Sequence, residues 1–272
     1  MLAIKNNLMA ANAARHLGNS YNALATSVER LSSGLRINSA KDDAAGLAVR
    51  ELMRANIAVI QQGARNAQDG ISMLQTMEGA LATIDDILVR MQALAEQAST
   101  GSYSSAQKTI MDDEFDELRQ EVDRIATATA FNAITMLDNT ATVTIQFGEL
   151  TSDTINIAGE NVTSASAGLN ITALAIGTTA SAQAALATIE TAIDTKDTAR
   201  AKFGYKMNRP ENTVSVLNIQ AENLMIAESR ISDVDVATEM ANMTRNQVLA
   251  QAGIAMLSQA NSMPQMALTL LR

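Results

Sequence analysis

The chain has 272 residues, no cysteine, one histidine and a formal net charge of −9. Without cysteine it forms no disulfide scaffold, thiolate zinc site or cysteine nucleophile, and the acidic balance argues against a general nucleic-acid binder. Hydrophobic residues make up 47% but aromatic residues only 3%, and there are two prolines. Small and unbranched side chains with few prolines favour long, closely packed helices.

Charged residues are sparse near both ends of the chain, and most acidic residues lie in the middle. This distribution predicts ends that are buried and a middle that faces water. Residues 1–16 lack the pattern of a secretory signal peptide, and no run of about 18 apolar residues predicts membrane insertion. The lone His16 excludes a His-Glu-x-x-His metal site, and no nucleophile–base constellation predicts an enzyme.

Residues 1–37 are expected to form a helix with one apolar stripe. Its apolar residues alternate at intervals of four and three, which keeps them on one face of a helix, as in a coiled coil. The stripe consists of Leu17, Tyr21, Leu24, Val28, Leu31 and Leu35. Charged neighbours such as Glu29 and Arg30 are expected to set the register of packing and not its strength, because exposed ion pairs contribute only about 0–1 kcal/mol to stability.

Four further helices are predicted, over residues 43–99, 105–129, 181–230 and 234–270. The first of these repeats the intervals of four and three between Met77 and Met91. The last carries an apolar side formed by Val236, Met240, Met243, Ile254 and Leu257. A helix with a single apolar stripe needs a partner, and the natural partner of the first helix is the last one.

The section from 140 to 178 shows a different period. Apolar residues alternate with Thr, Gln and Asn in two short runs, separated by the turn region Gly148–Asp153. This alternation predicts a β-hairpin, which should lie against the helices because an isolated hairpin is marginally stable in water. The apolar positions of the two runs are Val143, Ile145 and Phe147, then Ile155 and Ile157.

These patterns predict a mainly α protein whose long antiparallel helices form a coiled-coil-like rod with a small β-hairpin region in the middle. Residues 1–40 and 235–272 would be paired terminal helices. Residues 41–139 and 181–234 would form a helical rod domain, and residues 140–180 a hairpin and loop.

Four segments carry a resemblance to a known family. Residues 31–48, LSSGLRINSAKDDAAGLA, closely resemble the N-terminal signature of bacterial flagellins, and residues 248–261, VLAQAGIAMLSQAN, resemble their C-terminal region. Residues 121–132 and 228–235 are also similar to the family. Two long motifs in the right order at opposite ends of the chain make the resemblance specific.

The resemblance implies a secreted, extracellular, non-enzymatic subunit without a cofactor, which forms a homopolymer, the filament of the bacterial flagellum. The paired end segments would line its channel, and the apolar stripes of the first and last helices would be the polymerisation interface. Only residues 159–180 remain for an outer domain, so a minimal flagellin is expected. Further implied partners are the flagellar type III export apparatus, an export chaperone and the filament cap.

The resemblance also covers three residues that a vertebrate Toll-like receptor recognises in flagellins, which correspond to Arg90, Leu94 and Glu114. One position departs from the family: Pro210 lies inside a predicted long helix, where flagellins usually have another residue. A proline there removes a hydrogen bond and clashes with the preceding turn. We therefore expect either a kink or a helix that restarts with Pro210 in its first turn.

Two other classes of protein share some of these features. A hook–filament junction protein has the same paired end helices, and a chemoreceptor-like signalling coil has long helices rich in Ala and Met. The C-terminal motif and the short middle section favour the filament subunit over the junction protein. A signalling coil would not explain either of the two end motifs.

Overall fold

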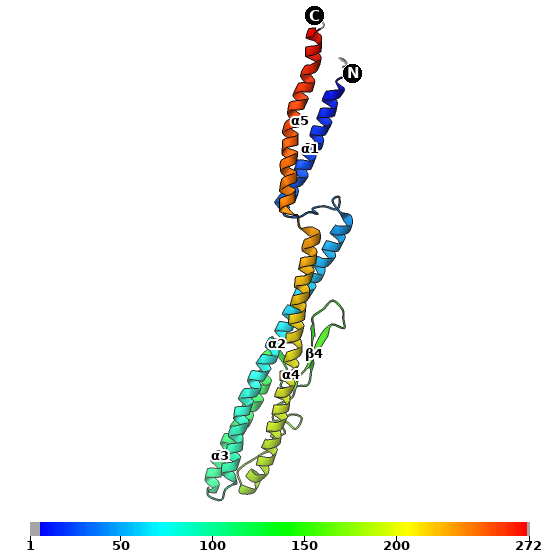
Figure 1. Cartoon of the computed structure of the whole chain (residues 1–272). Coiled ribbons are helices and arrows are strands. Elements are labelled where there is room, and N and C mark those ends of the chain that lie inside the picture. Colours follow the sequence, from blue (N-terminus) through cyan, green and yellow to red (C-terminus); the bar gives the residue numbers. More distant parts are fainter. Residues whose placement is uncertain (1–5, 271–272) are drawn as a thin grey trace. The chain divides into compact units, whose positions relative to one another are not determined.

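The computed structural model describes residues 6–270, which form five α-helices and four short β-strands (Figure 1). In chain order these are α1 (Leu8–Ser33), α2 (Ala44–Ser99), α3 (Ser105–Ala128), β1 (Ala130–Phe131), β2 (Ile134–Thr135), β3 (Thr142–Gln146), β4 (Thr154–Ala158), α4 (Thr179–Ser232) and α5 (Val236–Leu270). The predicted mainly α class is confirmed.

The chain divides into two compact units, Met1–Ile57 with Glu222–Arg272 and Ala58–Ala221. The predicted domain boundaries at 40/41 and 234/235 fall inside the first unit, and the predicted hairpin region 140–180 falls inside the second.

Capping residues determine where α1 begins and ends. The Asn7 side chain accepts a hydrogen bond from the Ala10 amide at the start of the helix, and Gly34 closes its end at φ 74°. This left-handed conformation is easy for glycine and terminates a helix. The predicted continuation of the helix to residue 37 is therefore wrong, and its predicted start at residues 1–5 lies outside the described residues.

Within the first unit, the segments that follow α1 and α4 run side by side. Leu35 forms an isolated antiparallel bridge with Asp233, the Arg36 amide donates to the Ser232 carbonyl at 2.7 Å, and the Val234 amide donates to the Gly34 carbonyl at 3.0 Å. Residues 34–36 and 232–234 thus satisfy each other's backbone groups close to where both terminal helices are attached.

The second unit is built on a long seam, by which we mean the line of residues that one helix buries against its neighbours. From Ile60 to Ala98, a residue of α2 is buried every three or four positions, and the predicted stripe from Met77 to Met91 is fully buried. The buried apolar residues from Met73 to Ala98 form one hydrophobic core with α3, α4 and the hairpin, which lie together in Figure 1. The pattern is that of coiled-coil packing.

One position in the α4 seam is a lysine. Lys196 continues the row of buried alanines and isoleucine in α4, and its side chain is 1% exposed. Its Nζ atom donates to Asp85 Oδ1 on α2 and, at 2.6 Å, to Asp197 Oδ1. Burial alone would lower the pKa of Lys196, but the hydrogen bonds with Asp197 and Asp85 outweigh it and leave the pKa raised.

Pro210 lies inside α4, which is continuous from Thr179 to Ser232. The predicted restart of the helix at Pro210 is therefore wrong. The proline is buried on the same helical row as Phe203 and Leu217, each seven residues away. Burial of its ring in this row offsets part of the cost of the hydrogen bond that a proline cannot make.

The predicted hairpin is confirmed as the antiparallel pair β3–β4, in which Ile145 lies opposite Ile155. A second antiparallel pair, β1–β2, was not predicted. Its two turn residues, Asn132 and Ala133, have φ angles of 50° and 62°. A two-residue hairpin turn requires this conformation but is usually marked by Asn-Gly, so the sequence lacked the normal signal.

Three residues of α2 form the seat of the β3–β4 hairpin. A Cβ atom at Gly63 would overlap the Phe147 carbonyl oxygen, and one at Gly70 would overlap the Ile145 side chain. Between them, the Asn66 side chain donates to the Gln146 carbonyl at 2.9 Å. Gly63 therefore lets the hairpin backbone approach the helix directly, and Gly70 leaves room for the Ile145 side chain.

The loop between β4 and α4 is folded onto α3, and no separate outer domain is present among the described residues. Asp123 accepts hydrogen bonds from the amide and hydroxyl of Ser164, at 2.7 and 2.6 Å, and Arg119 donates to the Thr172 carbonyl at 2.7 Å. The apolar residues of this loop belong to the hydrophobic core: Val162, Leu169, Ile171 and Ile176.

Candidate assembly interface on the terminal helices

The helices α1 and α5, here called the terminal pair, lie side by side and antiparallel (Figure 1). The Asn7 side chain donates to the Ala260 carbonyl at 2.7 Å near one end, and Arg30 lies 3.8 Å from Glu239 near the other. Between them, Leu17 packs over Gly253. The predicted partnership of the first helix with the last one thus forms within a single chain.

The α1 seam shares three positions with the predicted stripe, and its other positions lie one residue earlier in the sequence than predicted. Leu17, Leu24 and Leu31 are half-buried against α5, and Ser20 and Ser27 occupy the positions between them. The remaining members of the stripe lie elsewhere: Tyr21 is 48% exposed and Val28 is 50% exposed, while Leu35 follows the helix in the bridge to Asp233.

The α5 seam is made mostly of small and polar residues. Positions at intervals of three and four are buried or half-buried: Glu239, Met243, Asn246, Ala250, Gly253, Leu257 and Ala260. Of the predicted stripe, Met243 and Leu257 belong to this seam, whereas Met240 and Ile254 are exposed.

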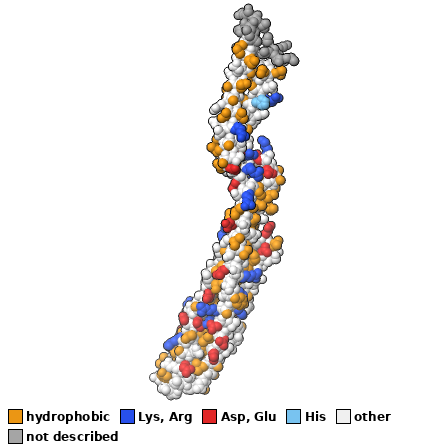
Figure 2. Space-filling model, in the orientation of Figure 1, with side chains coloured by type: hydrophobic (Ala, Val, Ile, Leu, Met, Phe, Trp, Pro, Cys, Tyr) orange, Lys and Arg blue, Asp and Glu red, His pale blue; other side chains and the backbone are white. Residues whose placement is uncertain are grey.

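Large apolar side chains cover the outer surface of the terminal pair instead. Figure 2 shows hydrophobic side chains spread over these helices with few charges among them. The exposed members include Leu8, Met9, Tyr21 and Val28 on α1, and Val236, Met240, Val248, Leu249, Ile254 and Met256 on α5. Such a surface is normally covered by another protein surface.

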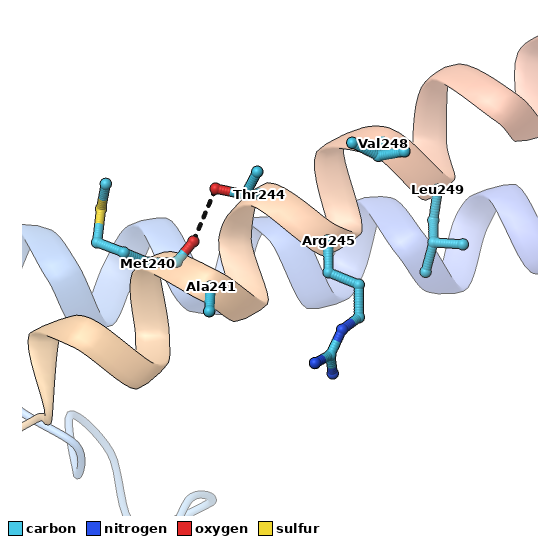
Figure 3. A pocket seen from close by; sticks show the side chains of 6 residues that line it. All are labelled: Met240, Ala241, Thr244, Arg245, Val248 and Leu249. Atoms are coloured by element: carbon cyan, nitrogen blue, oxygen red, sulfur yellow. Dashed lines mark hydrogen bonds between the residues drawn. The ribbon is translucent and has the colours of Figure 1, made fainter.

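A shallow depression lies on the outer side of α5. It is lined by Met240, Ala241, Thr244, Arg245, Val248 and Leu249 (Figure 3). The Thr244 hydroxyl is satisfied within the helix, because it donates to the Met240 carbonyl at 2.8 Å. In Figure 3 the side chains of Arg245 and Leu249 leave the helix on the same side.

Charges within the terminal pair are few. Arg30 turns toward Glu239, which is 8% exposed, while Glu29 is exposed on another side of α1. Glu29 and Arg30 therefore do not act as a pair, since consecutive helical residues do not face each other. Hydrogen bonds from the Thr238 hydroxyl and amide lower the pKa of Asp235, whose carboxylate also accepts from the Ala237 amide at the start of α5.

Two of the three residues matched to receptor recognition lie together on the surface of the second unit. Arg90 on α2 and Glu114 on α3 form an ion pair at 2.6 Å, with side chains 53% and 45% exposed. Leu94 is only 2% exposed and belongs to the hydrophobic core. The structure therefore presents a charged pair at this place, with the leucine beneath the surface.

Within residues 6–270, no helix is long and apolar enough to cross a membrane, and no three His, Cys, Asp or Glu side chains are grouped so that they could hold a metal ion. His16 is exposed on α1.

Two chain ends that pair as helices and present large apolar side chains outward define a structural subunit that assembles with further copies. Comparisons with known proteins specify the family. The bacterial flagellin N-terminal helical region matches residues 4–142, and the bacterial flagellin C-terminal helical region matches residues 186–271. The chain belongs to the bacterial flagellin family.

The individual relatives agree with this assignment. A flagellin from Halalkalibacterium halodurans is 43% identical over 272 residues, covering 100% of both chains. The crystal structure of Bacillus cereus flagellin is 32% identical with a TM-score of 0.51 and covers 60% of this chain and 94% of that one. A putative flagellar hook-associated protein from Vibrio parahaemolyticus, 14% identical with a TM-score of 0.61 over 71% of this chain and 100% of that one, shares the fold.

The protein is thus a non-enzymatic structural subunit of the flagellar filament, an extracellular assembly. Its family implies polymerisation into that filament, and the relative from H. halodurans matches it without a large inserted outer domain.

Proposed function

We propose that the outer surface of the terminal pair is the polymerisation interface, covered in the filament by α1 and α5 of other copies. One observation carries the proposal: the fully buried residues between the two helices are small or polar, whereas ten large apolar side chains of the terminal pair are exposed. Ser27, Ala250 and Ala260 are buried, whereas Val248 and Ile254 are more than half exposed.

The magnitudes favour folding that is coupled to assembly. Ordering the backbone costs about 1–2 kcal/mol per residue, and the seam offsets only part of this cost, because its large apolar residues are half-buried and most of its other members are small or polar. Burying one Val, Leu, Ile or Met side chain contributes roughly 1.5–3 kcal/mol. The ten exposed apolar residues named above therefore represent more stabilisation than the seam itself, and this becomes available only when other copies cover them.

The geometry of this contact also supports growth without closure. In the proposed filament α1 of one copy covers α5 of a second copy, while its own α5 is covered by a third copy, so each contact joins two different faces. Heterologous contacts of this kind produce helical polymers when their rotation does not close a ring.

Electron microscopy of the concentrated full chain tests the proposal. We expect filaments from the intact protein and none from a version that lacks residues 235–272. The variant Val248→Asp, which places a charge on the outer surface of α5, should also fail to assemble. Leu150→Asp, at an equally exposed apolar position in the hairpin turn, is the matched control and should assemble. Filaments of normal length from Val248→Asp would contradict the proposal.

Further partners follow from family membership and belong to the same proposal. We infer that the chain is exported through the flagellar type III export apparatus and adds to the filament beneath the cap. An export chaperone would cover the apolar surface of α5 before assembly. A binding measurement with the cognate chaperone should detect the full chain but not the version without residues 235–272.

The vertebrate Toll-like receptor is a further inferred partner. The exposed Arg90–Glu114 pair would contact the receptor, while Leu94 would act from the core by holding α2 in place. In receptor reporter cells, Arg90→Ala should reduce signalling at unchanged thermal stability, whereas Leu94→Ala should reduce both. Full signalling by Arg90→Ala would reject this role.

A further inference from the structure

The terminal pair contains two charged side chains without a hydrogen bond or an ion pair in the described part of the chain. Glu29 on α1 and Arg245 on α5 are both exposed. Among residues 6–270, neither forms an ion pair or a hydrogen bond through its side chain. Arg30, in contrast, faces Glu239, and Arg15 donates to Asn12 at 2.7 Å.

Both side chains lie on surfaces that the proposed function places inside the filament. Glu29 adjoins the exposed Val28, and Arg245 lies in the depression with Met240, Val248 and Leu249. Covering these apolar residues removes water from the neighbouring charges. A charge that loses water without gaining a partner is strongly destabilising, so each needs an opposite charge in the assembled state.

Few partners exist within the terminal helices. The acidic residues of α1 and α5 are Glu29 and Glu239, and Glu239 is buried against Arg30. Glu29 is therefore the one carboxylate of these two helices that is free to meet Arg245. Because Asn7 lies level with Ala260 and Arg30 with Glu239, Arg245 is roughly 9 Å from the level of Glu29 along the helix axis, at 1.5 Å per residue.

We propose that Arg245 of one copy forms an ion pair with Glu29 of a neighbouring copy, and that this pair sets the register between copies in the filament. The inference rests on the proposed function, because it requires α1 of one copy to cover α5 of another. A neighbour displaced along the axis brings the two side chains level, which the chain alone does not do. Arginine suits this position because its planar guanidinium binds a carboxylate through two hydrogen bonds.

Charge reversal in the full chain tests the ion pair. Glu29→Arg and Arg245→Glu should each raise the critical concentration for filament formation tenfold or more, because each places like charges in contact. The double variant should return it to within about threefold of the wild-type value. Far-UV circular dichroism of the free subunits is expected to remain unchanged, since neither side chain has a partner within the described residues.

Mixing the two single variants distinguishes a contact between copies from one within a chain. In an alternating copolymer, half of the contacts join the arginine introduced at position 29 of one variant to the glutamate introduced at position 245 of the other. The remaining contacts join the native Glu29 to the native Arg245. An equimolar mixture should therefore assemble at a total concentration at which neither variant assembles alone.

Three outcomes of these assays separate the two proposals. Normal assembly of either single variant would overturn the pairing. Failure of the equimolar mixture to assemble would overturn the contact between copies, whether or not the double variant assembles. Failure of the wild-type chain to assemble would instead reject the proposed function.

Discussion

Replacing Gly63 by alanine should detach the hairpin from α2. The added Cβ atom would overlap the Phe147 carbonyl oxygen, and no side-chain rotation relieves a clash with the backbone. Overpacking of this kind costs about 1–3 kcal/mol, and alanine returns only about 0.8–1 kcal/mol through its higher helix propensity. The net expectation is a loss of stability, because the strand must move or α2 must bend.

A matched control lies in the same helix. Gly79 is exposed and a Cβ atom there would meet nothing within 4 Å, so Gly79→Ala should show the propensity gain alone. For a domain of this size, 1 kcal/mol corresponds to about 2–4 °C in the unfolding midpoint. Calorimetry should therefore find a higher midpoint for Gly79→Ala and a lower one for Gly63→Ala. Equal increases in both variants would refute the proposed seat of the hairpin.

Three further substitutions follow from the structure. The raised pKa of Lys196 contributes stability that is present below the unfolded value of about 10.4 and is lost as the pH rises through the folded value. The urea midpoint of unfolding should therefore fall between about pH 9 and pH 12 in the wild-type protein, and Lys196→Met should remove this fall. An equal fall in the wild-type protein and the variant would contradict the prediction. The lowered pKa of Asp235 contributes stability that is present above about pH 3.9 and is lost as the pH falls through the folded value. Asp235→Asn, which still caps the helix, should weaken that acid dependence in thermal scans, and an unchanged acid transition would count against the cap. Pro210→Leu should raise the thermal midpoint, because it restores a helical hydrogen bond and removes the clash of the ring with the preceding turn, which together cost about 3 kcal/mol; no gain would show that the buried ring compensates fully.

The second unit could be predicted well from its sequence because each helix there has one buried side. The stripe from Met77 to Met91 is both the most regular apolar pattern in the chain and fully buried. The hairpin was predictable for the same reason, since its alternation matches one face packed on the helices. Periodicity is informative when burial comes from a single direction.

Other features of the second unit depend on contacts that no local pattern encodes. A glycine within a helix normally indicates a weak point, so Gly63 could not be recognised as the seat of a strand that is distant in sequence. A lysine at a seam position is normally exposed, and Lys196 is tolerated because the neighbouring Asp197 and Asp85 on another helix both accept hydrogen bonds from it. Such positions require the tertiary structure.

The ambiguity of the terminal helices has a different physical origin. In α1, two rows with a seven-residue spacing are apolar: Leu17, Leu24 and Leu31 form one, and Tyr21 and Val28 form part of the other. Only the first row faces α5. A helix that is covered by one partner needs a single stripe, whereas a helix that is covered from several directions needs apolar residues on several sides. The second row of α1 and the exposed apolar side chains of α5 therefore have one common explanation, which is burial against further copies of the same chain.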